Sequence, residues 1–135
     1  MPLQITKGCR QLVAEAEKEI ETIGAADALE LHGSEDVLFV DLRDVRELWR
    51  EGFIPGAFHC PRGMLEFWID PDSIYYKDIF ASGKKFLFYC NLGWRSALAA
   101  QVSQQMGLTP VAHLGGGFEA WQAAGGPVAK KEAKK

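Results

Sequence analysis

The sequence has no apolar run long enough to cross a membrane, few cysteines and no strong excess of charge of one sign. A membrane-spanning helix needs about 20 predominantly apolar residues, and no stretch of the chain approaches that length. The three cysteines, Cys9, Cys60 and Cys90, show no C-x-x-C spacing, which argues against a disulfide framework and a zinc site. A net charge of −3 gives no reason to expect nucleic acid or an anionic membrane as a partner.

The beginning of the chain also lacks the apolar segment of a secretory signal, so we expect a cytoplasmic protein with free thiols. With 135 residues, the chain has the length of one domain with a hydrophobic core. Lysines gather at its end, and we therefore expect residues 129–135 to form a disordered basic tail. At the other end, residues 1–20 form an expected N-terminal helical extension whose apolar side carries Leu12, Val13, Ala16 and Ile20.

Segments typical of strands alternate with segments of helical periodicity. Strands are predicted at 21–23, 37–40, 57–60, 85–89 and 110–114, and helices at 8–20, 25–31, 44–51, 64–68, 73–80, 96–106 and 118–124. This alternation predicts an α/β fold, with a parallel sheet covered by helices on both faces. In such sheets the reactive groups lie outside the carboxyl ends of the strands. Asp41 and Cys90 are both predicted at such ends.

Cys90 stands where a predicted strand turns into a predicted helix. The N-terminus of a helix has unpaired backbone N–H groups and the positive end of the helix dipole, which together stabilise an anion. We therefore expect this thiol to ionise more readily than a free cysteine and to act as a nucleophile. Arg95 adds a positive charge nearby, and Gly93 suits a turn that requires a positive φ. The alternative is an inert buried cysteine at a strand end.

Four segments together resemble the rhodanese, or sulfurtransferase, family. They are residues 40–44, 51–57, 90–95 and 114–121, and the resemblance extends from about residue 21 to residue 128. It implies a five-stranded, mostly parallel sheet and a cysteine that carries sulfane sulfur as a persulfide. Cys90 matches that cysteine, and the substrate-binding loop C-x-x-G-x-R is completed by Asn91, Leu92, Gly93, Trp94 and Arg95.

The resemblance implies transfer of sulfur from a small donor, thiosulfate or a persulfide, to cyanide, a thiol or a protein acceptor. Neither a metal nor an organic cofactor is needed for that reaction. Asp41 and Arg43 match a D-x-R segment whose side chains support the cysteine loop; the alternative is a plain ion pair at a strand end. Arg62 lies in a connection that could form one side of the pocket. For Met64, Phe67 and Trp68 in the same connection, core packing is the expected role.

The chain departs from the family pattern at two places. Phe53 replaces a histidine that is generally structural, which leaves the chemistry untouched. Leu92 and Trp94 make the cysteine loop bulkier and less basic than in enzymes that handle thiosulfate well. Desolvating a dianion against an apolar wall is costly. We therefore expect weak binding of thiosulfate and better use of a less charged persulfide or polysulfide.

Two other functions compete with sulfur transfer. Cysteine phosphatases and arsenate reductases share this kind of fold, but their loops place one residue more between cysteine and arginine than the four found here. A binding or regulatory module without turnover is the second alternative, although such versions usually lose the cysteine that is present here. Cys9 and Cys60 are expected to be buried apolar residues. Structural roles are expected for the three histidines, which are His32, His59 and His113.

Overall fold

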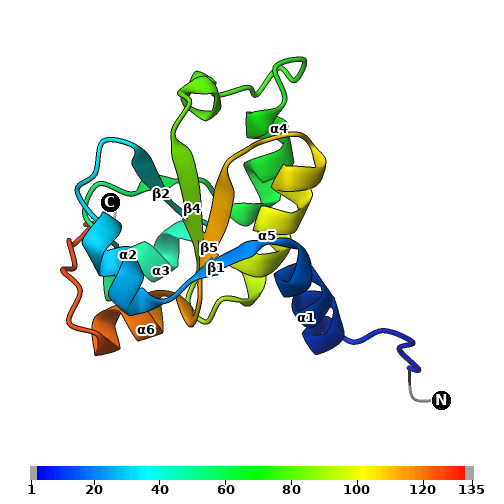
Figure 1. The fold of residues 1–135 in the computed structure, drawn as a ribbon, viewed down its shortest axis with the longest axis horizontal. Coiled ribbons are helices and arrows are strands. Elements are labelled where there is room, and N and C mark those ends of the chain that lie inside the picture. The colour runs from blue at the N-terminus through cyan, green and yellow to red at the C-terminus, as the bar shows by residue number, and fades with distance from the viewer. Residues whose placement is uncertain (1–2, 133–135) are drawn as a thin grey trace.

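The computed structural model describes residues 3–132, and its strands form a single parallel sheet (Figure 1). The order across the sheet is β1-β5-β4-β2-β3, so β4 lies at the centre. Every pairing between neighbouring strands is parallel. The strands are β1 (Glu21–Ile23), β2 (Val37–Asp41), β3 (Phe58–His59), β4 (Lys85–Tyr89) and β5 (Val111–Leu114). The predicted α/β architecture is confirmed.

Helices cover both faces of the sheet (Figure 1). In Figure 1, α2, α3 and α6 lie on one side and α1, α4 and α5 on the other. The helices are α1 (Cys9–Glu19), α2 (Ala25–Leu31), α3 (Val45–Glu51), α4 (Leu65–Ile69), α5 (Trp94–Gln105) and α6 (Gly117–Ala123). Two short 3-10 helices, η1 (Arg62–Met64) and η2 (Asp78–Ala81), complete the elements. Within residues 3–132, no helix is long and apolar enough to cross a membrane.

The position of β4 at the centre of the sheet, covered on both faces, explains why its sequence is a continuous apolar run. Side chains alternate between the two faces of a strand. Phe86 and Phe88 pack into the cluster beneath α4 and α5, whereas Leu87 and Tyr89 pack into the cluster beneath α2 and α6. A parallel strand that is covered on both faces must be apolar at successive positions. This burial holds the end of β4, and with it Cys90, in a fixed place.

Helix α1 packs against α5 through one narrow apolar face. Val13 and Ala16 form a small cluster with Ala97 of α5, and Ile20 packs against its edge. The prediction that Leu12 belongs to this face is wrong, because its side chain is 42% exposed. The face that packs follows the spacing of positions 13, 16 and 20, and position 12 lies beside it rather than on it.

The connection between α4 and β4 contains less helix than the sequence suggests. A helix is predicted over 73–80, but the structure has only the short η2 at Asp78–Ala81. Asp70 and Ser73 accept hydrogen bonds from the backbone N–H groups two residues on, of Asp72 at 2.8 Å and of Tyr75 at 3.0 Å. Such local side-chain bonds stabilise turns in competition with a helix.

The end of the chain returns to the domain next to α3. Phe53 and Ala129 exchange two backbone hydrogen bonds, of 2.9 and 2.8 Å, in an isolated antiparallel bridge. The first residue of the expected disordered tail is therefore paired with the domain. Residues 133–135 of that tail lie outside the described part of the chain.

Candidate active site

Cys90 directly follows the central strand and lies at the carboxyl edge of the sheet, where Asp41 ends the neighbouring strand β2. The residue is only 1% exposed, yet it lines a surface pocket of about 210 Å³. The other lining residues are Asn91, Leu92, Trp94 and Arg95. The structure thus brings together at one pocket five of the six loop residues that the sequence singled out.

Gly93 completes the loop by turning the backbone toward the sulfur. Its φ of 100° is in the left-handed region, and α5 begins at the next residue. In this conformation the backbone N–H of Gly93 donates a hydrogen bond to Cys90 Sγ, with N and Sγ 3.1 Å apart. A residue with a side chain would be strained at this φ. The glycine therefore provides the donor that stabilises negative charge on the sulfur.

The start of α6 is hydrogen-bonded to the backbone of the cysteine loop. The backbone N–H groups of Phe118 and Glu119 donate to the carbonyl oxygens of Cys90 and Asn91, at 2.7 and 3.1 Å. Gly117 approaches so closely that a Cβ there would lie 2.5 Å from the carbonyl carbon of Asn91. The sequence indicates only a tight turn at residues 115–117. The structure shows that this turn also anchors the cysteine loop.

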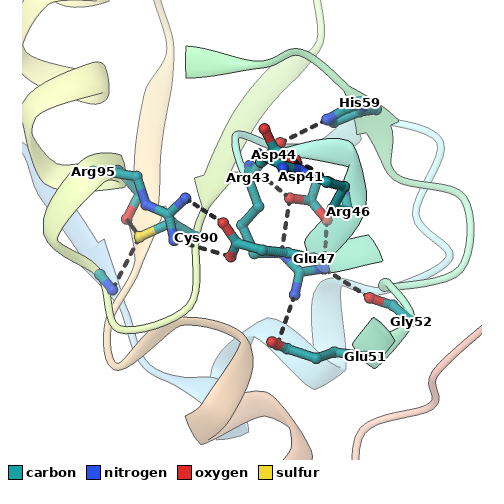
Figure 2. Close-up of polar contacts among 12 residues, drawn as sticks. Asp41, Arg43, Asp44, Arg46, Glu47, Glu51, Gly52, His59, Cys90 and Arg95 are labelled. Atoms are coloured by element: carbon teal, nitrogen blue, oxygen red, sulfur yellow. Dashed lines mark hydrogen bonds and ion pairs between the residues drawn. The ribbon is translucent and has the colours of Figure 1, made fainter. Parts of the chain in front are cut away.

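Asp41 and Arg43 form a fully buried ion pair (Figure 2). Arg43 donates to the Asp41 carboxylate through Nε at 3.0 Å and Nη2 at 2.8 Å, and through Nη2 to the carbonyl of Gly52 at 2.7 Å. Its guanidinium carbon also lies 4.3 Å from the ring centre of Phe118. Burial alone would lower the pKa of Arg43, but Asp41, with smaller contributions from Tyr89 and Glu47, raises it, so the guanidinium stays charged.

This pair connects elements rather than entering the pocket. It links the end of β2 to the end of α3 at Gly52 and to the start of α6 at Phe118. Because α6 holds the carbonyls of the cysteine loop, Asp41 and Arg43 reach that loop indirectly.

Arg95 is bound to a carboxylate from α3. In Figure 2 its guanidinium faces Glu47, and the two side chains share hydrogen bonds of 2.8 and 3.1 Å. The hydrogen bonds with Glu47 raise the pKa of Arg95. Partial burial pushes the pKa of Glu47 up, but Arg95, a backbone hydrogen bond with Asp44 and the charge of Arg43 together lower it more, so the carboxylate stays ionised. The positive charge at the pocket is therefore largely neutralised by a partner that the sequence interpretation did not include.

The rim of the pocket is apolar. Leu92 is 52% exposed and Trp94 is 43% exposed. Arg10 of α1 lies against the Trp94 ring, 5.8 Å from its centre. Arg62 is paired with Glu66 at 2.8 Å and does not line the pocket of Cys90.

The apolar residues that follow Arg62 have different roles. Trp68 packs against the core, with its ring 5.9 Å from that of Phe58, as predicted. The prediction that Phe67 is a core residue is wrong, because it is 53% exposed. Helix α4 is only five residues long, and its buried side is taken by Leu65 and Ile69.

The other two cysteines have different surroundings. Cys60 is fully buried, and burial raises the pKa of its thiol to about 12, so it remains neutral. Cys9 is the first residue of α1 and is exposed, which corrects the expectation that it is buried. Among residues 3–132, no three or more His, Cys, Asp or Glu side chains are grouped so that they could hold a metal ion.

Sequence reasoning missed two buried polar residues beside the sulfur. Ser96 Oγ lies 3.7 Å from Cys90 Sγ, and His113 Nδ1 lies 2.9 Å from Ser96 Oγ. His113 belongs to β5, which pairs with β4 and places His113 opposite Phe88. Only the strand order brings this histidine to the site, and no local pattern in the sequence reveals that order.

Comparison with known proteins agrees with this geometry. The chain matches the family model described as "Rhodanese-like domain" over residues 24–124. Over 96 residues it is 25% identical to thiosulfate sulfurtransferase/rhodanese-like domain-containing protein 3 of Mus musculus, a match that covers 67% of this chain and 61% of the mouse protein. The matched region thus spans less than two thirds of that relative.

Two solved structures are similar over most of their length. A protein of unknown function from Rhodopseudomonas palustris CGA009, described as a possible tyrosine phosphatase, is 58% identical, with a TM-score of 0.93, and the match covers 96% of this chain and 99% of that one. A rhodanese-related protein from Thermoplasma volcanium is 29% identical, with a TM-score of 0.65, over 82% of this chain and 99% of that one. The family match extends from the end of β1 to α6 and contains the whole cysteine loop. The chain therefore belongs to the rhodanese-like domain family.

Proposed function

We propose that this protein is a sulfurtransferase in which Cys90 carries sulfane sulfur as a persulfide. The observation that carries the proposal is the position of Cys90, a residue that lines the pocket and whose Sγ accepts a hydrogen bond from the Gly93 N–H at 3.1 Å. An N–H group that is already aimed at the sulfur stabilises a charged sulfur without reorganisation. The family match supports the same chemistry.

In the first step, the Cys90 thiolate attacks the outer sulfur of the donor. A bond forms between the two sulfur atoms, and the donor's own bond to that sulfur breaks. The electron pair of the broken bond leaves with the remainder of the donor, as sulfite from thiosulfate or as a thiolate from a persulfide. The product is Cys90–S–S⁻, whose negative charge remains inside the loop.

In the second step, an acceptor nucleophile attacks the outer sulfur of the persulfide. The S–S bond breaks, its electron pair returns to Cys90, and the thiolate is regenerated for the next cycle. Cyanide would be converted to thiocyanate, and a thiol of a small molecule or a protein would become a persulfide. Both steps move one sulfur atom between anions, and neither requires a metal, an organic cofactor or a general acid.

A phosphatase is the second candidate, because the 58% identical protein is described as a possible tyrosine phosphatase. Binding of a phosphate ester needs a loop that surrounds a tetrahedral dianion and an arginine free to pair with its oxygens. Here four residues separate Cys90 from Arg95, and both hydrogen bonds of the Arg95 guanidinium go to Glu47. This arrangement favours a single sulfur atom over a phosphate group.

The test measures both activities on the same preparation. We expect thiocyanate to form from cyanide when thiosulfate or a thiol persulfide is supplied, and Cys90→Ser to abolish this activity. A circular dichroism spectrum identical to that of the wild type would show that the variant is folded. We expect no turnover of a small aryl phosphate. Cys90-dependent hydrolysis of the aryl phosphate without thiocyanate formation would replace sulfur transfer with the phosphatase assignment.

A further inference from the structure

A chain of buried polar side chains leads from the sulfur of Cys90 toward α1. Cys90 Sγ lies 3.7 Å from Ser96 Oγ, which lies 2.9 Å from Nδ1 of His113. Cys90, Ser96 and His113 are 1%, 0% and 1% exposed. Buried polar groups are almost always hydrogen-bonded, but a line of three that begins at a nucleophile also forms a path for a proton.

The far side of His113 leads to solvent. Its Nε2 lies 3.1 Å from Thr22 Oγ1 of β1 and 3.5 Å from Glu17 Oε2 of α1. The Glu17 side chain is 44% exposed, so its carboxylate contacts water. The N-terminal helix thereby provides the outer end of a path that begins at the buried sulfur.

Building on the proposed sulfur transfer, we propose that Ser96, His113 and Glu17 form a proton relay that carries the thiol proton of Cys90 to solvent and so produces the attacking thiolate. The sulfur has two hydrogen-bonding partners within residues 3–132, the N–H of Gly93 and the hydroxyl of Ser96. An amide N–H does not accept a proton, whereas a hydroxyl accepts one and donates another. Of the two protein groups bonded to the sulfur, Ser96 is therefore the one that can take up its proton.

The transfer balances without any further reactant. The S–H bond of Cys90 breaks and its proton binds Ser96 Oγ, while the original hydroxyl proton of Ser96 moves to Nδ1 of His113. The proton on Nε2 of His113 passes to the Glu17 carboxylate and then to water. At the end, Ser96 donates to the thiolate, Nδ1–H donates to Ser96, and Nε2 accepts from the Thr22 hydroxyl.

The charges around the path fit a neutral imidazole that changes tautomer. Burial lowers the pKa of His113, and the attraction of Glu17 offsets this only in part, so the ring is neutral near pH 7. The charged groups nearest the sulfur are Arg95 of α5 and its partner Glu47 of α3. Glu47 is the main partner of Arg95 and Cys90 contributes less to its raised pKa, so Arg95 assists the thiolate that the relay produces.

Ser96 touches the reacting sulfur, whereas His113 acts through Ser96 and is a positioning residue. The test follows alkylation of Cys90 by iodoacetamide against pH, in a Cys9→Ser background because Cys9 is exposed. We expect Ser96→Ala and His113→Asn each to slow alkylation roughly tenfold at pH 7, because each removes a link of the chain in which Nδ1–H donates to Ser96 and Ser96 donates to the thiolate. The plateau rate at high pH should be unchanged, because there the thiolate forms without help. Asn keeps a polar group facing Ser96, but unlike the imidazole of His113 it cannot accept a proton at one nitrogen and release one from another.

Ser103→Ala is the matched control. Ser103 is also a fully buried serine of α5, and its hydroxyl has no hydrogen-bond partner within the described residues. Its removal should leave the profile in place. The double variant Ser96→Ala/His113→Asn should move the profile no further than either single variant, because both interrupt one path. Profiles of the single variants that superimpose on that of the parent would overturn the relay, as would shifts that simply add.

A second measurement uses protein that keeps Ser96 and His113, and it therefore tests the relay even if the variants do not fold. The ¹⁵N chemical shifts of the His113 ring distinguish a proton on Nε2 from one on Nδ1. We expect Nε2–H while Cys90 is a thiol and Nδ1–H once it is a thiolate, and an unchanged tautomer would contradict the relay. Neither alkylation nor the nitrogen shifts involve a sulfur donor, so failure of the relay and failure of sulfur transfer are separate outcomes.

Discussion

Cys90 differs from the other two cysteines in both access and electrostatics. It alone combines a hydrogen bond donated by a backbone N–H with a place in the wall of a pocket. Cys60 lies in the core next to Leu65, and its raised pKa keeps it as a neutral thiol. Cys9 is exposed at the start of a helix and does not line the pocket of Cys90. One cysteine is therefore sufficient for the proposed chemistry.

Single replacements of the cysteines should separate these roles. We expect Cys90→Ser to abolish persulfide formation, while Cys9→Ser and Cys60→Ala retain sulfur transfer within about twofold of the parent protein. Removal of the Cys60 sulfur from the core should lower stability by roughly 1 kcal/mol. Thiocyanate formation and urea unfolding measure the two effects. Loss of transfer in a Cys60→Ala protein that remains folded would show that Cys60 takes part as a second, resolving thiol.

At the scale of elements, the cysteine loop depends on the start of α6 as much as on its own sequence. The N–H groups of Phe118 and Glu119 hold the carbonyls of Cys90 and Asn91. Gly117 allows the close approach, because a side chain would collide with the backbone of Asn91. The turn between β5 and α6 is therefore part of the site, although none of its residues lines the pocket.

We expect Gly117→Ala to disturb both stability and activity. Its φ of 63° disfavours a side chain, and a Cβ would lie 2.5 Å from loop atoms. Left-handed backbone alone costs about 1–2 kcal/mol for a residue other than glycine, and the collision adds to it. The prediction is a loss of roughly 2–4 kcal/mol in unfolding free energy, together with at least about tenfold slower alkylation of Cys90.

Gly83→Ala is the control for backbone strain alone. Gly83 has a φ of 80°, and a Cβ added there would have no neighbouring heavy atom within 4 Å. This variant should lose stability but keep the alkylation rate of Cys90. Equal effects of the two variants on alkylation would show that the contact between α6 and the loop does not position the sulfur.

The elements themselves were largely predictable because their signals are local. The apolar run before Cys90 predicts β4, and the helix predicted over 44–51 is α3, which Asp44 caps by accepting a hydrogen bond from the N–H of Arg46 at 2.9 Å. The turns after Asp70 were missed, because bonds from side chain to backbone compete with a helix there. The exposure of Phe67 was missed because α4 is short and buries one side only.

At the scale of the whole molecule, the site is made by strand order, which no local pattern encodes. The sheet order places β5 beside β4 and so brings His113 to Ser96. The position of α3 after β2 brings Glu47 to Arg95, and the packing of α1 on α5 brings Glu17 to His113. The position of Cys90 at the end of a strand was therefore identifiable from the sequence, whereas the side chains that surround it were not.

The same three-dimensional arrangement bears on the choice of donor. Arg43 is buried against Asp41, Arg62 is paired with Glu66, and Arg95 is paired with Glu47. None of these three arginines is an unpaired cation at the pocket, and the rim consists of Leu92 and of Trp94, against which the exposed Arg10 lies. A dianion such as thiosulfate would have to lose water without gaining full compensation. A less charged persulfide should therefore be the better donor.

The most direct test of sulfur transfer is site-resolved mass spectrometry of the intact protein after brief exposure to a donor. We predict that one added sulfur atom appears on Cys90, that it forms faster from a thiol persulfide than from thiosulfate at equal concentration, and that cyanide removes it. Cys90→Ser should acquire no such sulfur. A protein that gains no sulfur on Cys90 from either donor, while iodoacetamide still alkylates that residue, would contradict the proposed function.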